Sequence, residues 1–192
     1  MSARGIDQHQ GDPGTSWLSL SSKDIMAVEI ERRFLVRNPC EALGAGMEEP
    51  SHIVQGYFGC IDRLRVRVRI LSDDRGRCDA FLTFKGARRG YCRLEFEYPL
   101  SLGNARRALD TLPTNRIIRK RRHKVHNRDG MLWLVDQFEG PNDGLVLAEI
   151  ELSHAGQKIE MPPWIGEEIT FNSRYGNSRL AKFPMPSLLD AA

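Results

Sequence analysis

Residues 64–71 read Leu-Arg-Val-Arg-Val-Arg-Ile-Leu, a strict alternation of apolar and basic side chains. In a β-strand, residues two positions apart point to the same side of the sheet, whereas a helix would scatter this pattern around its axis. Arg65, Arg67 and Arg69 therefore share one side of a predicted strand, and the apolar residues between them share the other.

The same alternation recurs along the chain, between residues that favour turns. Asp73-Asp74-Arg75-Gly76 and Asp129-Gly130 supply turn chemistry, and the second is typical of a hairpin. Residues 101–112 instead place apolar side chains on one side of a helix that starts with a capping serine. We expect a mainly β (α+β) fold of antiparallel strands, with a loop over 38–51 and short helices or turns after Pro163 that close one end. The predicted strands span 27–36, 52–59, 64–71, 78–85, 91–99, 116–126, 131–138 and 144–153.

Charged residues on these strands are segregated by sign. The charged rows are Arg65, Arg67 and Arg69; Glu29 and Glu31, followed by Arg33; Arg93, Glu95 and Glu97; and Glu149 and Glu151. For any single strand, the ordinary explanation is an amphipathic sheet with its charged side in solvent. Like charges about 7 Å apart, however, repel by roughly 0.6 kcal/mol in water, and a partner of opposite sign relieves that cost. If the sheet closes into a barrel, these charged sides converge on one interior.

Phosphate and divalent metal chemistry would suit such an interior. Guanidinium groups bind phosphate oxygens bidentately and keep their charge. Mg²⁺ and Mn²⁺ prefer carboxylates together with substrate phosphate oxygens, and a metal held this way can orient a water for in-line attack. The sequence shows no arrangement typical of a Ser/His/Asp or Cys/His nucleophile, so we expect direct attack by water.

Length and composition narrow the class of protein. The chain has 192 residues, which suits one domain, and its net charge of +3 gives no overall basic field for nucleic acid. No apolar run is long enough to cross a bilayer, and the N-terminus lacks a secretory signal pattern. The four cysteines show no metal-finger spacing, so we interpret them as reduced thiols. We expect a cytoplasmic protein without a membrane or nucleic-acid partner, in which 1–25 is a disordered or extra tail and 26–192 is a single domain.

An ordered series of motifs resembles the CYTH domain, or triphosphate tunnel metalloenzyme, family. It begins with Glu29-Ile30-Glu31-Arg32-Arg33, which is similar to the family's ExExK/R signature. Later matches include Arg67-Val68-Arg69, Thr83-Phe84-Lys85-Gly86, Arg93-Leu94-Glu95-Phe96-Glu97, Lys120-Arg121-Arg122, Val135-Asp136-Gln137-Phe138, Ala148-Glu149-Ile150-Glu151 and Gly166-Glu167-Glu168-Ile169-Thr170. The resemblance is greatest to the short bacterial members. It implies an eight-stranded antiparallel closed tunnel, open at both ends, that uses Mg²⁺ or Mn²⁺ on a triphosphate substrate.

The resemblance also implies roles for individual residues. The metal-binding residues would be Glu29, Glu31, Glu149 and Glu151, of which Glu29 and Glu31 would also act in catalysis by positioning the attacking water. The phosphate-binding residues would be Arg33, Arg67, Arg69, Lys85, Arg93, Lys120 and Arg122. Lys85 or Lys120 would also stabilise the leaving group. Glu95, Asp136 and Glu168 would support these side chains.

The favoured function is an inorganic triphosphatase that cuts tripolyphosphate to pyrophosphate and phosphate. Class IV adenylate cyclase and thiamine triphosphatase are enzymatic alternatives within the same tunnel. A non-catalytic polyphosphate- or nucleotide-binding module is the alternative from another class, but retention of a polyanion alone needs no Glu pairs. An RNA-binding barrel would need an aromatic row among the basic residues, which the sequence lacks. The apolar outer sides of the strands would suit a homodimer.

Overall fold

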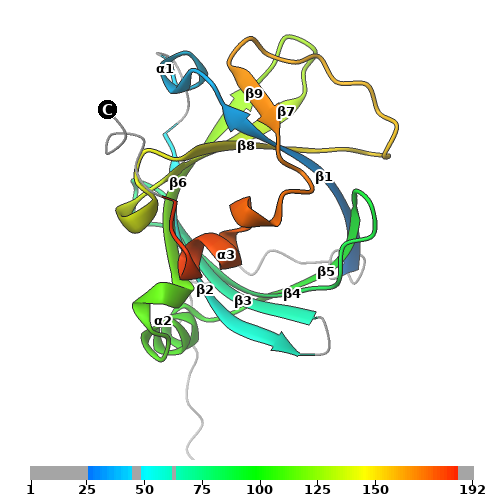
Figure 1. Cartoon of the computed structure of the whole chain (residues 1–192). Helices are drawn as coiled ribbons and strands as arrows, with labels where there is room; N and C mark the ends of the chain where they lie inside the picture. The colour runs from blue at the N-terminus through cyan, green and yellow to red at the C-terminus, as the bar shows by residue number, and fades with distance from the viewer. Residues whose placement is uncertain (1–25, 45–48, 62–63, 186–192) are drawn as a thin grey trace, which may run out of the picture.

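The computed structural model describes residues 26–44, 49–61 and 64–185, which form one antiparallel sheet and several short helices (Figure 1). The expectation for residues 1–25 lies outside the described residues. The strands are β1 (Met26–Val36), β2 (Ser51–Ile61), β3 (Leu64–Ser72), β4 (Cys78–Lys85), β5 (Cys92–Pro99), β6 (Ile117–His126), β7 (Leu132–Phe138), β8 (Val146–Glu151) and β9 (Ile165–Glu168). The helices are α1 (Pro39–Ala42), α2 (Leu102–Asp110) and α3 (Asn177–Lys182), with 3₁₀ turns η1 (Thr114–Arg116), η2 (Gly140–Asn142) and η3 (Ser173–Tyr175). Within these ranges, no helix is long and apolar enough to cross a membrane.

Strand β1 closes the sheet into a barrel. The strand order is β5-β4-β3-β2-β6-β7-β8-β1-β9, and β1 also pairs with β5 at the other end of this order. Residues 26–30 of β1 pair with β5, and residues 31–35 pair with β8. Strands β1 to β8 therefore form a complete ring, which Figure 1 shows as an open circle of ribbons. The predicted eight-stranded antiparallel barrel is confirmed, and every predicted strand has a counterpart.

Two short elements differ from the sequence-based expectations. Strand β9 lies outside the ring and pairs with β1 near Phe34, where we expected a helix or turn. A four-residue strand is too short to show an alternating pattern. The main chain of β9 also lies close to β1 at Gly166, where an added Cβ would be only 3.0 Å from the Leu35 carbonyl oxygen. Helix α1 lies in the predicted loop, where the Asn38 side chain accepts a hydrogen bond from the Glu41 N–H at 3.3 Å.

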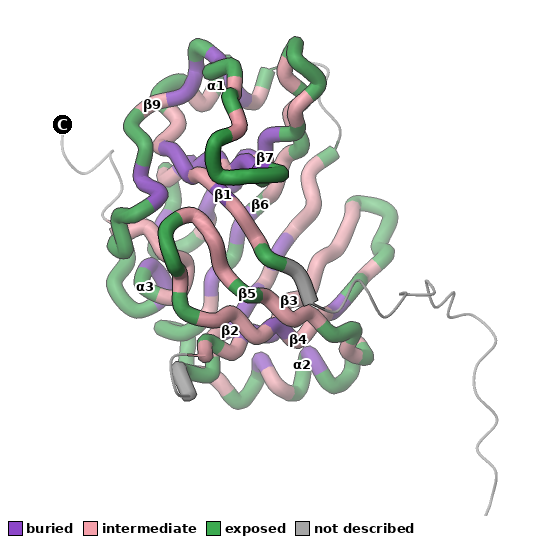
Figure 2. The backbone as a smooth tube through the Cα atoms, turned by 90° about the vertical axis from the view of Figure 1, so that its right-hand side faces the viewer, coloured by how far each residue is buried: buried purple, intermediate pink, exposed green. Residues whose placement is uncertain are grey.

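Outside the ring, the apolar sides of several strands pack under the surrounding segments, whereas Val28 of β1 and Leu94 of β5 stay exposed. Trp133 of β7 is completely buried and packs against Phe34 and Trp164, with ring centroids 5.6 Å apart in both pairs. Helix α2 covers another part of the wall, where Ala105 packs with Val68 of β3. Figure 2 shows the buried segments concentrated along the strands, whereas the connecting loops are mostly exposed.

Helix α3 packs against the interior at one end of the barrel. Leu180 and Ala181 form a buried cluster with Ile118, Phe138 and Leu147. These three strand residues lie two positions from Lys120, Asp136 and Glu149 respectively, and therefore point to the same inner side. Helix α3 thus lies inside one end of the ring (Figure 1), in keeping with the expectation of short helices or turns after Pro163 that close one end.

The Trp133 cluster should carry much of the fold's stability. We expect Trp133→Ala to lower the free energy of unfolding by roughly 3–5 kcal/mol, the cost of a large cavity in a packed core. Urea denaturation measures this loss. The control is Leu132→Ala, since Leu132 is 38% exposed on the same strand and should cost less than about 1 kcal/mol. Equal losses in the two variants would show that this cluster is not a core.

Candidate active site

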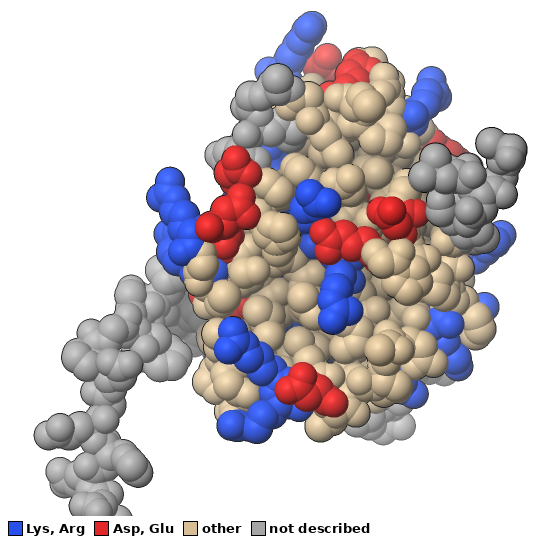
Figure 3. Space-filling view, turned by 90° about the vertical axis from the view of Figure 1, so that its left-hand side faces the viewer, with Lys and Arg blue, Asp and Glu red and all other residues tan. Residues whose placement is uncertain are grey.

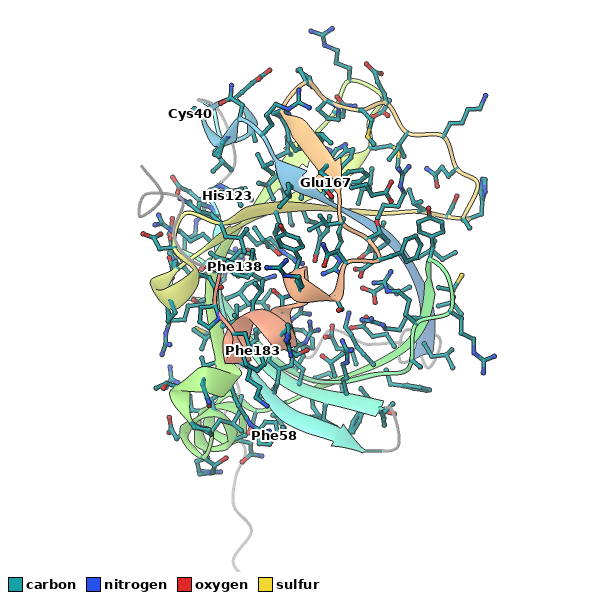
Figure 4. All side chains as sticks on the ribbon, viewed as in Figure 1. Cys40, Phe58, His123, Phe138, Glu167 and Phe183 are labelled. Atoms are coloured by element: carbon teal, nitrogen blue, oxygen red, sulfur yellow. The ribbon has the colours of Figure 1, made fainter. Side chains whose placement is uncertain are left out.

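The strand register brings the segregated charges together on the inner face of the barrel. Arg33 of β1 stands opposite Glu149 of β8, and Glu29 stands opposite Arg93 of β5. Residues that are directly opposite in an antiparallel pair share a side of the sheet. The charged rows on different strands therefore face one another across a common interior, and Figure 4 shows side chains from all sides of the ring projecting into it.

These side chains surround a cavity of about 380 Å³. Among the described residues, nine basic and six acidic side chains line it, which leaves a formal excess of three positive charges in this part of the lining. The basic residues are Arg33, Arg65, Arg67, Arg69, Lys85, Arg88, Arg93, Lys120 and Arg122, and the acidic residues are Glu29, Glu31, Glu95, Glu97, Glu149 and Glu151. Every residue predicted to bind phosphate or metal is in this lining. The excess positive charge suits a small polyanion.

Lys85 connects two acidic rows at one part of the wall. Its Nζ lies 3.0 Å from both carboxylate oxygens of Glu29 and 2.7 Å from Oε2 of Glu95. All three side chains are less than one-fifth exposed. Charge-assisted hydrogen bonds of this kind hold the ammonium in place until another anion competes for it.

Glu97 holds two members of the arginine row. Arg69 donates to Glu97 at 2.9 Å, and Arg67 lies 3.3 Å from the same carboxylate. The buried Thr83 hydroxyl also donates to Glu97 at 2.8 Å and accepts from Arg67 at 3.0 Å. Burial, together with the neighbouring Arg67 charge, lowers the pKa of Arg69 to about 10, so a bound anion would relieve an unfavourable placement.

Lys120 and Arg122 share the buried carboxylate of Asp136. Lys120 Nζ contacts Asp136, and Arg122 makes two hydrogen bonds of 2.7 Å to it and a third of 2.7 Å to Glu149. Burial lowers the pKa of Lys120 to about 8, although Asp136 favours its charged form. Burial acts to raise the pKa of Glu149, but the positive charges of Arg122, Lys120 and Arg33 outweigh it and hold that pKa well below its usual range.

The four carboxylates predicted to bind metal all line the cavity, and three of them are paired with cations. Glu29 contacts Lys85, Glu31 contacts Arg88, and Glu149 contacts Arg122. In the part of the chain that the structure describes, no three Asp, Glu, His or Cys side chains are grouped closely enough to hold a metal ion.

The electrostatics of these carboxylates nevertheless fit a divalent cation. Burial raises the pKa of Glu31, and the negative charges of Glu149 and Glu29 raise it further. Burial and the charges of the other three carboxylates also raise the pKa of Glu151. Mutually repelling oxygen donors of this kind are the usual ligands of Mg²⁺ and Mn²⁺.

Glu168 lies outside the cavity lining. Its carboxylate pairs with Arg32 on the outer side of β1, at 3.0 Å from the Arg32 Nε. It also accepts from the Thr170 hydroxyl at 2.7 Å, and that hydroxyl accepts from the main-chain N–H of Arg33 at 3.0 Å. Glu168 is thus linked to the backbone of Arg33 through the Thr170 hydroxyl. Among the described residues, no contact joins Glu168 to a side chain predicted to bind phosphate.

Sequence reasoning did not assign roles to Arg65, Arg88 or Glu97. Arg65 and Glu97 belong to rows that the alternation had already placed on the inner side. Arg88 lies between β4 and β5, where no periodic pattern operates, and only the folded loop brings it to Glu31.

The outer surface differs from the interior in its charge arrangement. Arg119 and Arg121 alternate with Lys120 and Arg122 along β6 and are exposed, as predicted, and Arg121 pairs with Glu139 at 3.0 Å. On the face drawn in Figure 3, basic and acidic side chains are interspersed among other residues. Like charges are therefore not gathered on this face as they are in the rows that line the cavity.

Comparison with known proteins places the chain among relatives of one kind. The profile of the CYTH domain matches residues 27–185. An inorganic triphosphatase of Acetivibrio thermocellus is 39% identical over 160 residues, which cover 83% of this chain and 96% of that protein. An inorganic triphosphatase of Nitrosomonas europaea is 31% identical over 156 residues, covering 80% and 96%.

A solved structure agrees with these relatives. The crystal structure of an inorganic triphosphatase matches with a TM-score of 0.60 and 29% identity, over 84% of this chain and 98% of the other. The profile match spans most of the sequence and includes all the charged strands of the cavity. This chain therefore belongs to the CYTH domain family.

Proposed function

We propose that this protein is a metal-dependent inorganic triphosphatase that hydrolyses tripolyphosphate to pyrophosphate and phosphate. The observation that carries the proposal is the enclosed cavity. Basic side chains outnumber acidic ones in its described lining, and all of them except Arg88 arise from the inner sides of the strands. A cavity with this balance attracts a polyanion and supplies carboxylates for its accompanying cations. The names of the relatives support the same activity.

The lining favours an inorganic substrate over a nucleotide. Tyr57 is the only aromatic residue among the described residues that line the cavity. Its hydroxyl accepts a hydrogen bond from the Gln55 side chain at 2.7 Å. Tyr57 also packs against the buried cluster under α3. A base or thiazole ring would therefore find no free aromatic surface on which to stack.

We assign phosphate binding to the predicted basic residues of the cavity. Arg67 and Arg69 would break their ion pairs with Glu97 and bind phosphate oxygens. Lys85 would likewise break its ion pairs with Glu29 and Glu95 and bind phosphate oxygens. Arginine forks hold phosphate in a fixed orientation, which aligns the terminal phosphorus for attack by water. Arg33, Arg93 and Arg122 complete this set.

Glu29, Glu31, Glu149 and Glu151 would hold Mg²⁺ or Mn²⁺. When bound, the metal supplies positive charge that neutralises phosphate oxygens and lowers the cost of charge development.

Lys120 is suited to assist the departing pyrophosphate. In hydrolysis, the oxygen of water forms a bond to the terminal phosphorus and gives up a proton to solvent, while the bond from that phosphorus to the bridging oxygen breaks. The leaving pyrophosphate gains negative charge, and Lys120 is a buried ammonium with a pKa lowered to about 8. A group with this pKa can stabilise that charge and donate a proton from Nζ near neutral pH.

A parallel substrate panel tests the assignment. With Mg²⁺ or Mn²⁺, tripolyphosphate should yield pyrophosphate and phosphate in equal amounts, and it should give the highest kcat/KM among tripolyphosphate, ATP and thiamine triphosphate. Product analysis by ion chromatography measures all three reactions. Formation of cyclic AMP from ATP would instead identify an adenylate cyclase, and faster turnover of thiamine triphosphate would identify that substrate. Tight metal-independent binding without any product would identify a binding module.

Two carboxylate variants should separate catalysis from stability. We expect Glu31→Gln and Glu149→Gln each to lower kcat by about 100-fold or more, or roughly 2.7 kcal/mol of barrier. At pH 7, Glu31→Gln should leave the free energy of unfolding unchanged or higher, because burial and like charges raise the pKa of Glu31. Glu149→Gln should lose roughly 1–3 kcal/mol, because its carboxylate is held charged by Arg122 and Lys120.

The stability that Glu149→Gln loses should depend on pH in a known direction. A carboxyl with a depressed folded pKa stabilises the fold above its unfolded value, which for Glu is 4.5. The stability deficit of Glu149→Gln should therefore shrink as the pH falls below about 4.5. Glu139→Gln is the matched control, since Glu139 pairs with Arg121 outside the barrel. Normal turnover in Glu31→Gln and Glu149→Gln would refute the metal assignment.

A further inference from the structure

The loop between β4 and β5 carries a basic residue into the cavity. The main-chain N–H of Gly86 donates to the Leu94 carbonyl at 2.9 Å, and the main chains of Arg89 and Cys92 exchange hydrogen bonds of 2.8 and 3.1 Å. The Tyr91 ring packs on Phe171 with a centroid distance of 4.9 Å, which joins the loop to the C-terminal segment. The loop is thus held at both of its ends.

Arg88 of this loop lies at the predicted metal site. Its side chain is 15% exposed and lines the cavity, and its Nη2 contacts the carboxylate of Glu31. Its Nη1 is buried and has no hydrogen-bond partner among the described residues, and the same holds for Nε of Arg93. The Nε atoms of Arg33, Arg67 and Arg69 in the same lining are likewise buried without a hydrogen-bond partner among the described residues. Buried guanidinium donors without partners around one cavity indicate a place for an anion.

We propose that Arg88 binds the terminal phosphate of tripolyphosphate and that, in the free protein, it pairs with the Glu31 carboxylate in place of the metal. This inference rests on the proposed function. A phosphate offers the guanidinium two oxygens in a forked arrangement, whereas Glu31 is held through Nη2 alone. Phosphate binding would therefore draw Arg88 away and leave Glu31 for a divalent ion. Arg88 and the metal compete for one carboxylate, so substrate and metal assist each other's binding.

The first test uses Mn²⁺ alone and needs no turnover. Calorimetric titration of Mn²⁺ into the free protein should show roughly 5- to 10-fold tighter binding for Arg88→Ala than for wild type, because a competing positive charge is removed. Arg89→Ala is the matched control, since Arg89 is the next residue of the same loop and is exposed. Its affinity for Mn²⁺ should equal that of wild type. An unchanged or weaker affinity in Arg88→Ala overturns the competition for Glu31.

The second test measures tripolyphosphate hydrolysis. Arg88→Ala should raise KM by roughly 10- to 100-fold, as expected for loss of a charge-assisted hydrogen bond, with a smaller change in kcat. Arg88→Lys should recover part of the loss, because it restores the charge without the forked geometry. Unchanged thermal unfolding midpoints would show that the loop still folds.

The two proposals fail in different ways. A wild-type protein that does not hydrolyse tripolyphosphate refutes the proposed function, while the Mn²⁺ titration still decides whether Arg88 occupies Glu31. An active wild type with an unchanged KM in Arg88→Ala overturns the phosphate-binding role of Arg88 and leaves the proposed function intact.

Discussion

The pairing of β1 with both β5 and β8 is the contact on which the rest of the molecule depends. Strand β1 supplies Glu29, Glu31 and Arg33 to the interior, and its two halves join the two ends of the eight-stranded order. If the sheet were open at this seam, the same charged side would face water, where screening weakens each ion pair. Closure places these charges in an enclosed space, where they act strongly on one another and on any bound anion.

Stability and function are assigned to opposite sides of the same strands. Removing charges from water is costly, and buried ion pairs rarely stabilise a fold more than apolar packing would. The outer sides supply that packing, through the cluster around Trp133 and through the contact of α2 with β3. The inner sides, apart from the apolar cluster under α3, are therefore free to hold a set of charges that serves binding.

The acidic residues of the cavity have two uses in this arrangement. Without substrate, Glu29, Glu97 and Glu149 act as counter-ions that hold the basic residues in position. A polyphosphate would take over the cations, and divalent ions would take over the carboxylates. The site is thus organised before the substrate arrives, which reduces the reorganisation needed during reaction. The same exchange accounts for the proposed behaviour of Arg88 at Glu31.

The alternation of side chains in the sequence was sufficient to predict the eight barrel strands and which charges share a side, because a strand's period of two is a local property of the backbone. It could not predict β9, whose four residues are too few to show a period, or which strand residues α3 contacts at the end where closing helices or turns were expected. Nor could it predict the position of Glu168 beside Arg32, or the arrival of Arg88 at Glu31. Those contacts join segments far apart in the chain, and only closure of the sheet and docking of its loops determine which of them meet.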